Sequence, residues 1–365
     1  MGIKGRIWQR GDKWQVIIVT GRHANGNEKR NYYTCDSEGD AQRLLHTKMA
    51  EMYAGTYTEP SKLTLEAFSR QWLTDYAELN MRPSTHQYYE HLLRLHAWPH
   101  IGAVKMSELR PSHIQRVLAV AQRGGKSPKT VKHIHATMRR VLAQAVKWGL
   151  LQRNPASLVD TPRVPRKEIQ VWSAEQAQTF LDAVQAHWLH PFFHLALATG
   201  MRRGELIGLQ WRDVDWTAGT VSVRRSAVAN RGKTVLQEPK TAAGTRTITV
   251  GERALAVLRE HRTAMHRQHG LGILQVFPSE IGTLLPTTTP RRVMARHIKT
   301  TGLPHIPLHG LRHTHATLLL VAGIHPKVVS ERLGHSSVQI TLDTYSHLLP
   351  NLQREAATAI DAVLR

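Results

Sequence analysis

The stretch from Pro307 to Leu348, PLHGLRHTHATLLLVAGIHPKVVSERLGHSSVQITLDTYSHL, constrains this chain more than any other. Its apolar run predicts a helix. His309 and Arg312 lie three residues apart at the start of that run, so their side chains should emerge on one helix face. Farther on, His335 follows Gly334, a residue type that ends helices. We expect the two donors, His309 and Arg312, to converge on one point.

Tyr345 is the only tyrosine after Tyr89. A tyrosine hydroxyl is a weak nucleophile at its ordinary pKa of about 10, so neighbours must neutralise the charge that develops as it attacks. We expect Tyr345 to be an exposed phenol near cationic donors. Such a phenol suits covalent attack on phosphorus.

The histidines also admit a metal interpretation. His309 and His313 have the i, i+4 spacing of zinc ligands. However, no HExxH glutamate lies between them, and Arg312 would place a cation beside a dication. Zinc is therefore the weaker interpretation, and we expect His313 and His315 to serve packing or solvent contact.

Three motifs in this stretch, HGLRHTHAT, LGHSS and TLDTYSHL, resemble in order and spacing the C-terminal signature of the tyrosine recombinases, the phage-integrase family. The resemblance implies a site-specific DNA recombinase that cuts and rejoins strands through a 3′-phosphotyrosine. It implies Tyr345 as the nucleophile and His309, Arg312 and His335 as further catalytic residues.

Two other segments carry the same resemblance. ATGMRRGELIGL resembles the family's other arginine box, which implies Arg202 as the first catalytic arginine. Glu205, at i+3 from Arg202, is expected to support that guanidinium. PKTAAGTR resembles the family's β-hairpin lysine motif, which implies Lys240 as the general acid for the leaving 5′ oxygen.

Charge and composition point to the same class of partner. Lys and Arg number 49 against 27 Asp and Glu, and the net charge of +22 favours a polyanion, DNA or RNA ahead of an acidic membrane surface. No stretch approaches the roughly 20 apolar residues of a membrane span, and no signal peptide is recognisable. The single cysteine, Cys35, excludes an intrachain disulfide framework and fits a reducing cytoplasm.

The family resemblance further implies double-stranded DNA with core and arm attachment sites, a homotetramer on that DNA, and DNA-bending and directionality accessory proteins. It places the chain in the bacterial cytoplasm, at the nucleoid. No cofactor and no metal are expected, because cationic side chains take the role that Mg²⁺ has in other phosphoryl transfers and no P-loop pattern occurs.

The predicted fold is mainly α with small β-sheets (α+β), in three domains. Residues 1–58 predict a three-stranded antiparallel sheet with one helix, an arm-type DNA-binding domain by resemblance. Residues 62–156 predict a four-helix core-binding domain, in which Leu79 belongs to the apolar face of the first helix and Pro99 ends the second. Residues 168–365 predict a catalytic domain, with a small β-sheet between residues 219 and 250. A basic linker, TPRVPRKEIQ, precedes it.

Two alternatives stay open from the sequence. A type IB topoisomerase would share this chemistry but relax DNA as a monomer, and a non-catalytic DNA-binding regulator would use the same fold without the reaction. The presence of all six expected catalytic residues argues against the regulator, and the arm-like N-terminal segment argues against relaxation. The tail after Pro350 predicts an amphipathic helix that packs on its own domain or docks on a neighbouring protomer.

Overall fold

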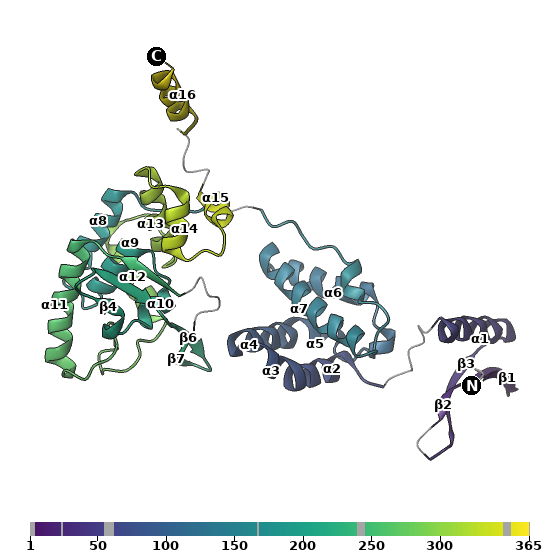
Figure 1. Cartoon of the computed structure of the whole chain (residues 1–365). Helices are drawn as coiled ribbons and strands as arrows, with labels where there is room; N and C mark the ends of the chain where they lie inside the picture. The colour runs from purple at the N-terminus through teal and green to yellow at the C-terminus, as the bar shows by residue number, and fades with distance from the viewer. Residues whose placement is uncertain are drawn as a thin grey trace. The chain divides into compact units, whose positions relative to one another are not determined.

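The computed structural model describes residues 4–22, 25–54, 62–165, 168–238, 245–345 and 352–364. The chain divides into two compact units, Met1–Arg166 and Lys167–Arg365 (Figure 1). Helices predominate in both units, and among the described residues the first unit contains one small sheet and the second contains two. The predicted α+β class is confirmed.

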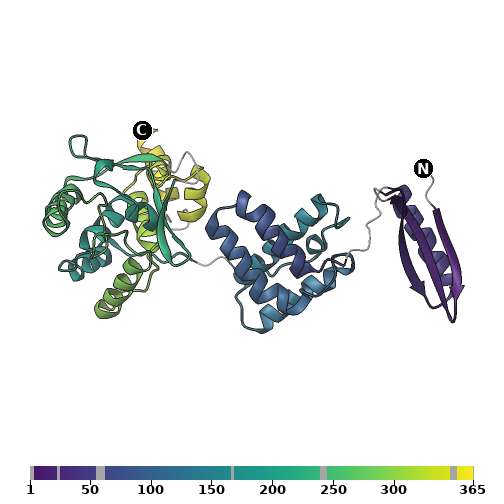
Figure 2. The same cartoon turned by 90° about the horizontal axis from the view of Figure 1, so that it is seen from below.

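The chain begins with an antiparallel sheet in the order β1-β2-β3, made of β1 (Lys4–Arg10), β2 (Lys13–Arg22) and β3 (Glu28–Cys35). The helix α1 (Glu38–Tyr53) starts after Ser37, whose side chain accepts a hydrogen bond from the Asp40 backbone N–H. α1 lies along one face of the sheet (Figure 2), where Ala41 packs with the buried Val16 and Ile18. The predicted sheet and helix are therefore confirmed.

The rest of the first unit is helical. Its α-helices are α2 (Leu65–Trp72), α3 (Glu78–Asn80), α4 (Pro83–Leu92), α5 (Trp98–Ile101), α6 (Pro111–Arg123) and α7 (Pro128–Lys147), with 3₁₀ turns at Met106–Glu108 and Pro155–Leu158. The longest, α7, begins after Ser127, which caps the Thr130 N–H, and carries Pro128 at its first position. These helices enclose an apolar core that includes Phe68, Trp72 and Leu142.

Two π-helical turns explain why two of the helix predictions for this unit are wrong. Leu73–Ala77 joins α2 to α3, and Leu93–Ala97 joins α4 to α5. The predicted helix end at Pro99 is wrong, because α5 runs to Ile101 with Pro99 in its first turn, where a missing N–H is tolerated. Leu79 is 81% exposed and not in the core, because a π turn holds an extra residue and rotates the positions after it.

The second unit mixes helices with two small sheets. Its elements are α8 (Ala174–Ala183), α9 (His190–Thr199), α10 (Arg203–Ile207), a 3₁₀ turn (Trp211–Asp213), β4 (Val214–Asp215), β5 (Thr220–Val223), β6 (Ser226–Asn230), β7 (Lys233–Gln237), β8 (Arg246–Thr249), α11 (Glu252–His269), α12 (Thr289–Thr301), α13 (Gly310–Val321), α14 (Pro326–Leu333), α15 (Val338–Tyr345) and α16 (Leu352–Val363). One sheet has the antiparallel order β4-β5-β8, and β6 and β7 form a separate hairpin. The predicted single sheet is thus two.

The helix α9 organises this unit. It contacts α8, α10, α11 and α13 (Figure 1). Its buried Phe192, Phe193 and Leu195 belong to the main apolar core. The end of α9 is therefore fixed against α13 and the start of α10, the two helices that carry the predicted arginines. In the described ranges no helix combines the length and the apolar character that crossing a bilayer requires.

Candidate active site

Arg312 is buried in the first turn of α13. Its side chain is only 3% exposed, and its Nη1 donates to the carbonyl of Gly200 over 2.9 Å. Its Nη2 is buried and has no hydrogen-bond partner among the described residues. Burial, and next the positive charge of Arg202, lower the pKa of Arg312 to about 9. The site thus holds a cation with an unused donor.

Gly200 determines how α9 reaches this site. It ends α9 in the left-handed conformation, with φ of 65°. A Cβ on Gly200 would lie 2.6 Å from Cδ2 of His315 and 2.7 Å from Cδ2 of Leu333, which is closer than side chains approach. Only glycine fits between α13 and α14 here, and the turn it makes delivers Arg202 to the start of α10.

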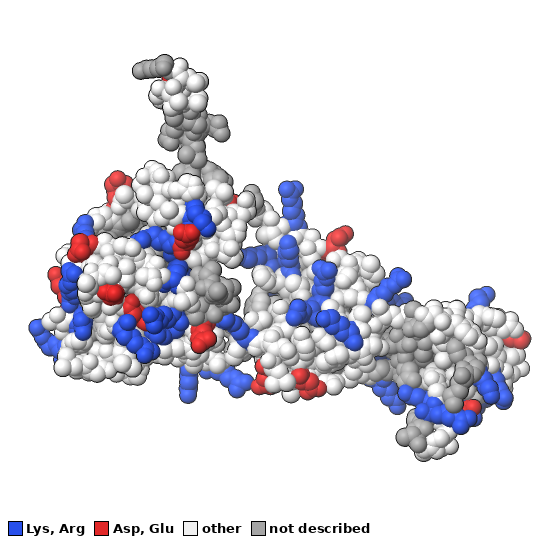
Figure 3. Space-filling model, in the orientation of Figure 1, with Lys and Arg blue, Asp and Glu red and all other residues white. Residues whose placement is uncertain are grey.

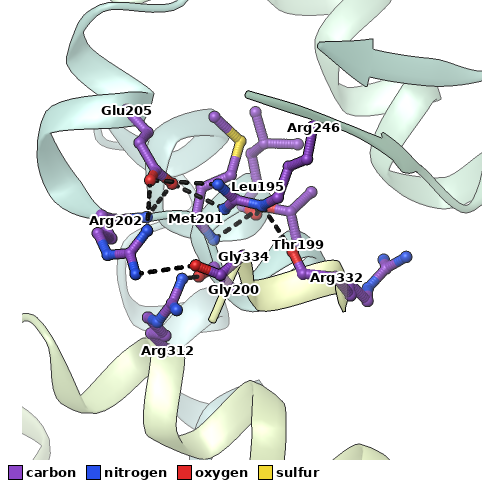
Figure 4. Close-up of polar contacts among 10 residues, drawn as sticks. All are labelled: Leu195, Thr199, Gly200, Met201, Arg202, Glu205, Arg246, Arg312, Arg332 and Gly334. Carbon is purple, nitrogen blue, oxygen red and sulfur yellow. Dashed lines mark hydrogen bonds and ion pairs between the residues drawn. The ribbon is translucent and has the colours of Figure 1, made fainter. Parts of the chain in front are cut away.

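Arg202 and Glu205 form a reciprocal cap on α10. The Glu205 carboxylate accepts from the Arg202 backbone N–H and from its Nη1, both at 2.8 Å. The same carboxylate accepts two hydrogen bonds from Arg246 on β8, with Nη2 at 2.8 Å and Nη1 at 3.2 Å (Figure 4). Burial alone would raise the pKa of Glu205, but the hydrogen bond and charge of Arg246, followed by the contacts of Arg202, hold it below its usual value. Glu205 is therefore a buried carboxylate shared by two arginines.

His335 lies just after α14, which ends at Gly334 in the left-handed conformation. Its Nδ1 shares a hydrogen bond of 2.8 Å with Oγ1 of Thr341, and Arg202 Nη2 lies 3.4 Å from the Gly334 carbonyl that it donates to. Burial, then the charges of Arg312 and Arg202, lower the pKa of His335 to about 4. The ring is neutral at pH 7.

Tyr345 ends α15 and is buried. Its exposed fraction is 1%, and its ring packs with an apolar cluster that includes Ala316, Leu320 and Leu333. Its hydroxyl shares a hydrogen bond of 2.8 Å with Nδ1 of His313, and burial raises the pKa of Tyr345 to about 12. The predicted exposed phenol is wrong, because the apolar faces of α13 and α14 cover the ring.

His309 completes the group at the start of α13. It is the residue before the first turn, and its exposed ring lies 4.8 Å from the His313 ring, centroid to centroid. Partial burial of the ring against the protein, followed by the charges of His313 and Arg312, lowers the pKa of His309 to about 4. His309 thus offers a neutral imidazole to solvent.

The structure brings together five of the six predicted catalytic residues, Arg202, His309, Arg312, His335 and Tyr345, and places the supporting Glu205 beside them. Lys240 lies outside the described residues. Within the described ranges, no group of three or more His, Cys, Asp or Glu side chains is arranged to hold a metal ion.

Comparison with known proteins identifies this arrangement. Residues 170–351 match the model of the phage integrase family, and residues 64–119 match that of the phage integrase N-terminal SAM-like domain. The chain belongs to the phage integrase family. This chain is accordingly a tyrosine-type site-specific DNA recombinase, as predicted from its motifs.

Individual members of the phage integrase family show the same likeness. A tyrosine recombinase XerC-like protein of Caldanaerobacter subterraneus subsp. tengcongensis is 27% identical and covers 95% of each chain. The structure of the Tn1549 transposon integrase in complex with a circular intermediate DNA has a TM-score of 0.70 at 21% identity, over 82% of this chain and 99% of that one. A lambda integrase tetramer bound to a Holliday junction has a TM-score of 0.60 at 17% identity, over 92% and 94%. These structures share the integrase fold.

Sequence reasoning missed three residues of this integrase site. His313, expected to serve packing or solvent contact, is hydrogen-bonded to Tyr345. Arg246 holds Glu205, and Arg332 donates to the carbonyls of Ala198 and Thr249, both at 2.9 Å. Arg246 is the last residue of the PKTAAGTR motif, so that motif could have identified it.

Proposed function

We propose that this chain integrates or excises a mobile element or phage genome by cutting and rejoining double-stranded DNA at attachment sites. In each cut, the Tyr345 oxygen forms a bond to the scissile phosphorus and the bond from phosphorus to the 5′ oxygen breaks. The resulting 3′-phosphotyrosine conserves the energy of the bond, so the reverse attack by a 5′ hydroxyl rejoins a strand without a nucleotide cofactor.

The unpartnered Nη2 of Arg312 carries this proposal. A buried donor without a partner lowers the stability of the fold by roughly 1–3 kcal/mol. A donor kept in this state indicates a site that receives an acceptor from a bound substrate. Arg202 lies beside Arg312, and together the two guanidinium groups suit the non-bridging oxygens of a phosphodiester. As charge builds on these oxygens during attack, the two arginines stabilise it without any need to move.

The proton transfers are assigned to the remaining residues. The phenol proton passes to a neutral histidine, and His313 is the one in hydrogen-bonding contact with the Tyr345 hydroxyl. His309 and His335 supply hydrogen bonds or proton transfer to the phosphate oxygens, and Lys240 protonates the leaving 5′ oxygen. The neutral state of His309 and His335 follows from their low pKa values.

The DNA partner is supported by the charge of the first unit. Basic side chains outnumber acidic ones on the visible face of the helical bundle (Figure 3). A hollow of about 420 Å³ on α7 is lined by Lys132, His135, Arg139, Arg140 and Thr161. We assign residues 62–156 to core-site binding, residues 1–58 to arm-site binding and residues 168–365 to catalysis, on bacterial nucleoid DNA in the cytoplasm.

We further propose that the chain acts as a homotetramer on DNA, with DNA-bending and directionality proteins as accessory partners. The lambda integrase tetramer on a Holliday junction supports this assembly. In α16, Ile360 and Val363 are 51% and 76% exposed, which leaves apolar surface for docking on a neighbouring protomer.

A randomised library of nicked duplexes tests the reaction. The nick lets a cleaved strand end diffuse away, so the wild-type chain should remain covalently bound to the duplexes that it cuts, and sequencing identifies the site. Tyr345→Phe should bind the same duplexes and form no adduct on a denaturing gel, because the nucleophilic oxygen is gone. An adduct that persists in Tyr345→Phe, or none with wild type, contradicts the proposal.

A further inference from the structure

The two arginines that share Glu205 differ in their exposure. The Arg202 side chain is 42% exposed, whereas the side chains of Arg246 and Glu205 are 8% and 6% exposed. A substrate oxygen can therefore reach Arg202, whereas Arg246 is buried. The two guanidinium groups approach the Glu205 carboxylate from different sides (Figure 4). All three guanidinium nitrogens of Arg246 donate to protein acceptors, whereas Nη2 of Arg312 has no partner among the described residues, so Arg246 is the arginine that is committed to the protein itself.

The contacts of Glu205 account for both of its oxygens. Oε1 accepts from Nη1 of Arg202 at 2.8 Å and from Nη1 of Arg246 at 3.2 Å. Oε2 accepts from the Arg202 backbone N–H and from Nη2 of Arg246, both at 2.8 Å. A carboxylate has about four acceptor positions, so these four donors satisfy it. Arg246 binds it with the two-pronged geometry that makes guanidinium–carboxylate pairs strong.

We propose that Arg246 is a positioning residue of the recombinase site, the buried counter-ion of Glu205 that leaves the charge of Arg202 available to the scissile phosphate. With Arg246 present, the Glu205 charge is balanced from inside the protein, and Arg202 contributes a net positive charge to the substrate. Without Arg246, the pair of Arg202 and Glu205 is neutral overall, and its attraction for a phosphate weakens. This inference rests on the proposed function, because it assigns Arg202 to the phosphate.

A second contact links Arg246 to His335. The Nε of Arg246 donates to the backbone carbonyl of Arg332 over 2.8 Å, two residues before Gly334. The Arg332 side chain in turn donates to the carbonyls of Ala198 and Thr249. One side chain on β8 thus fixes both the first catalytic arginine and the end of α14, after which His335 follows.

The pKa of Glu205 agrees with this division of roles. Burial favours the neutral acid, and the hydrogen bond and charge of Arg246 are the largest opposing influences, ahead of the contacts from Arg202. Arg246 is therefore the main reason that Glu205 stays ionised in a buried position.

The test compares single and double variants on the nicked core duplex recovered from the library, with single-turnover adduct formation as the readout. Arg246→Met should slow adduct formation by up to about 10²-fold, because Glu205 would then offset the charge of Arg202, and the upper limit is the loss of that one preorganised donor to the developing charge. Its Kd for the duplex should stay within about threefold of wild type, because contacts along the phosphate backbone dominate binding.

The double variant Arg246→Met with Glu205→Gln distinguishes two roles for Arg246, that of a counter-ion to Glu205 and that of a residue that only maintains the fold. Removing the Glu205 charge frees Arg202 from a neutral pair, so the double variant should form adduct at least about tenfold faster than Arg246→Met. Arg246→Lys, which keeps the charge but loses the two-pronged contact, should fall between Arg246→Met and wild type.

Arg259→Met on α11 is the matched control. It removes an arginine that is half exposed and 3.7 Å from Glu252, and it should keep the wild-type rate. A wild-type rate in Arg246→Met, or a double variant no faster than that single variant, overturns the inference. If thermal melting shows that Arg246→Met is unfolded, the double variant tests the inference by itself. A double variant that is folded but forms no adduct contradicts the counter-ion role. Failure of the wild-type chain to form an adduct would instead refute the proposed function.

Discussion

The helices α7 and α13 each bury one side, yet the buried side chains differ in their chemistry. On α7 the covered residues are mostly apolar, such as Val131, Ile134 and Leu142, and among its described residues no buried side-chain polar atom lacks a partner. On α13 they include Arg312 and Thr317, each with a buried polar atom that has no partner in the described structure. Burial on α7 stabilises the fold, whereas burial on α13 prepares a site at a cost in stability.

That cost is visible at Arg312. Lowering a pKa from 12.5 to about 9 means that burial, together with the charge of Arg202, disfavours the charged form by on the order of 5 kcal/mol. A bound phosphate would restore favourable interactions for this charge. The contrast with α7 predicts that the two helices respond in opposite ways to substitution.

The largest effect is expected for Arg312→Met. Adduct formation should fall by about 10²-fold to 10³-fold, because a donor to the non-bridging oxygens is lost. The free energy of unfolding, measured by urea titration, should stay within about 1 kcal/mol of wild type, because removing a costly buried charge offsets the lost hydrogen bond to Gly200. A large loss of stability with normal cleavage would reverse this assignment of α13.

Leu142→Ala on α7 is the opposite case. Leu142 is fully buried, and its truncation should lower the free energy of unfolding by about 3 kcal/mol through lost burial and a residual cavity. The adduct rate per folded molecule should not change, as measured at a temperature where the variant is folded. A specific loss of cleavage at full folding would show that the bundle core contributes to chemistry.

Lowering the pH should reduce the folding stability of the second unit, because His315 is buried there in its neutral form. Its Nδ1 donates to the Leu197 carbonyl at 2.7 Å and its Nε2 accepts from Arg332 Nε at 3.2 Å, and burial lowers the pKa of His315 to about 4. Because the folded pKa lies below the ordinary value of 6.5, the unfolded chain binds the proton first, and stability falls as the pH drops from about 6.5 toward 4.

Between pH 7 and pH 5 this histidine should account for about 2 kcal/mol of lost stability. His315→Asn, which cannot be protonated, should lose correspondingly less over the same range in urea titrations at the two pH values. An unchanged pH dependence in His315→Asn would show that other groups control acid unfolding.

The smallest change in stability is expected from deleting residues 351–365. Ile360 and Val363 are exposed in α16, so the thermal midpoint of the truncated chain should match wild type. Assembly on DNA, followed by native gel electrophoresis, should be weakened if α16 docks on a neighbour. A truncated chain that recombines normally, or one that is grossly unfolded, would refute docking.

The sequence predicted those parts of the molecule that local patterns determine. The α7 helix follows from its Ser127 cap and apolar spacing, and the site residues were predicted from motifs, and the structure places five of these residues together. The helix end at Pro99 was misplaced because a π turn leaves no clear pattern in the sequence. The two sheets of the second unit were merged into one because strand pairing is a non-local property.

The missed contacts have the same origin. His313 meets Tyr345 from 32 positions away, and Arg246 meets Glu205 from 41 positions away, so no spacing rule connects them. Tyr345 was expected to be exposed because nucleophiles must reach their substrates. Its burial depends on how α13, α14 and α15 pack together, which the motif does not encode.

The burial of Tyr345 also determines the reactivity of the resting chain. A phenol with a pKa of about 12 carries almost no phenolate at neutral pH, and a 1% exposed ring is closed to reagents in solution. Tyr32, Tyr53 and Tyr88, which are 60%, 74% and 41% exposed, would meet an oxidant or an electrophile first. The oxygen of the proposed nucleophile is therefore chemically protected while the ring stays buried, and damage to the exposed tyrosines leaves that oxygen intact.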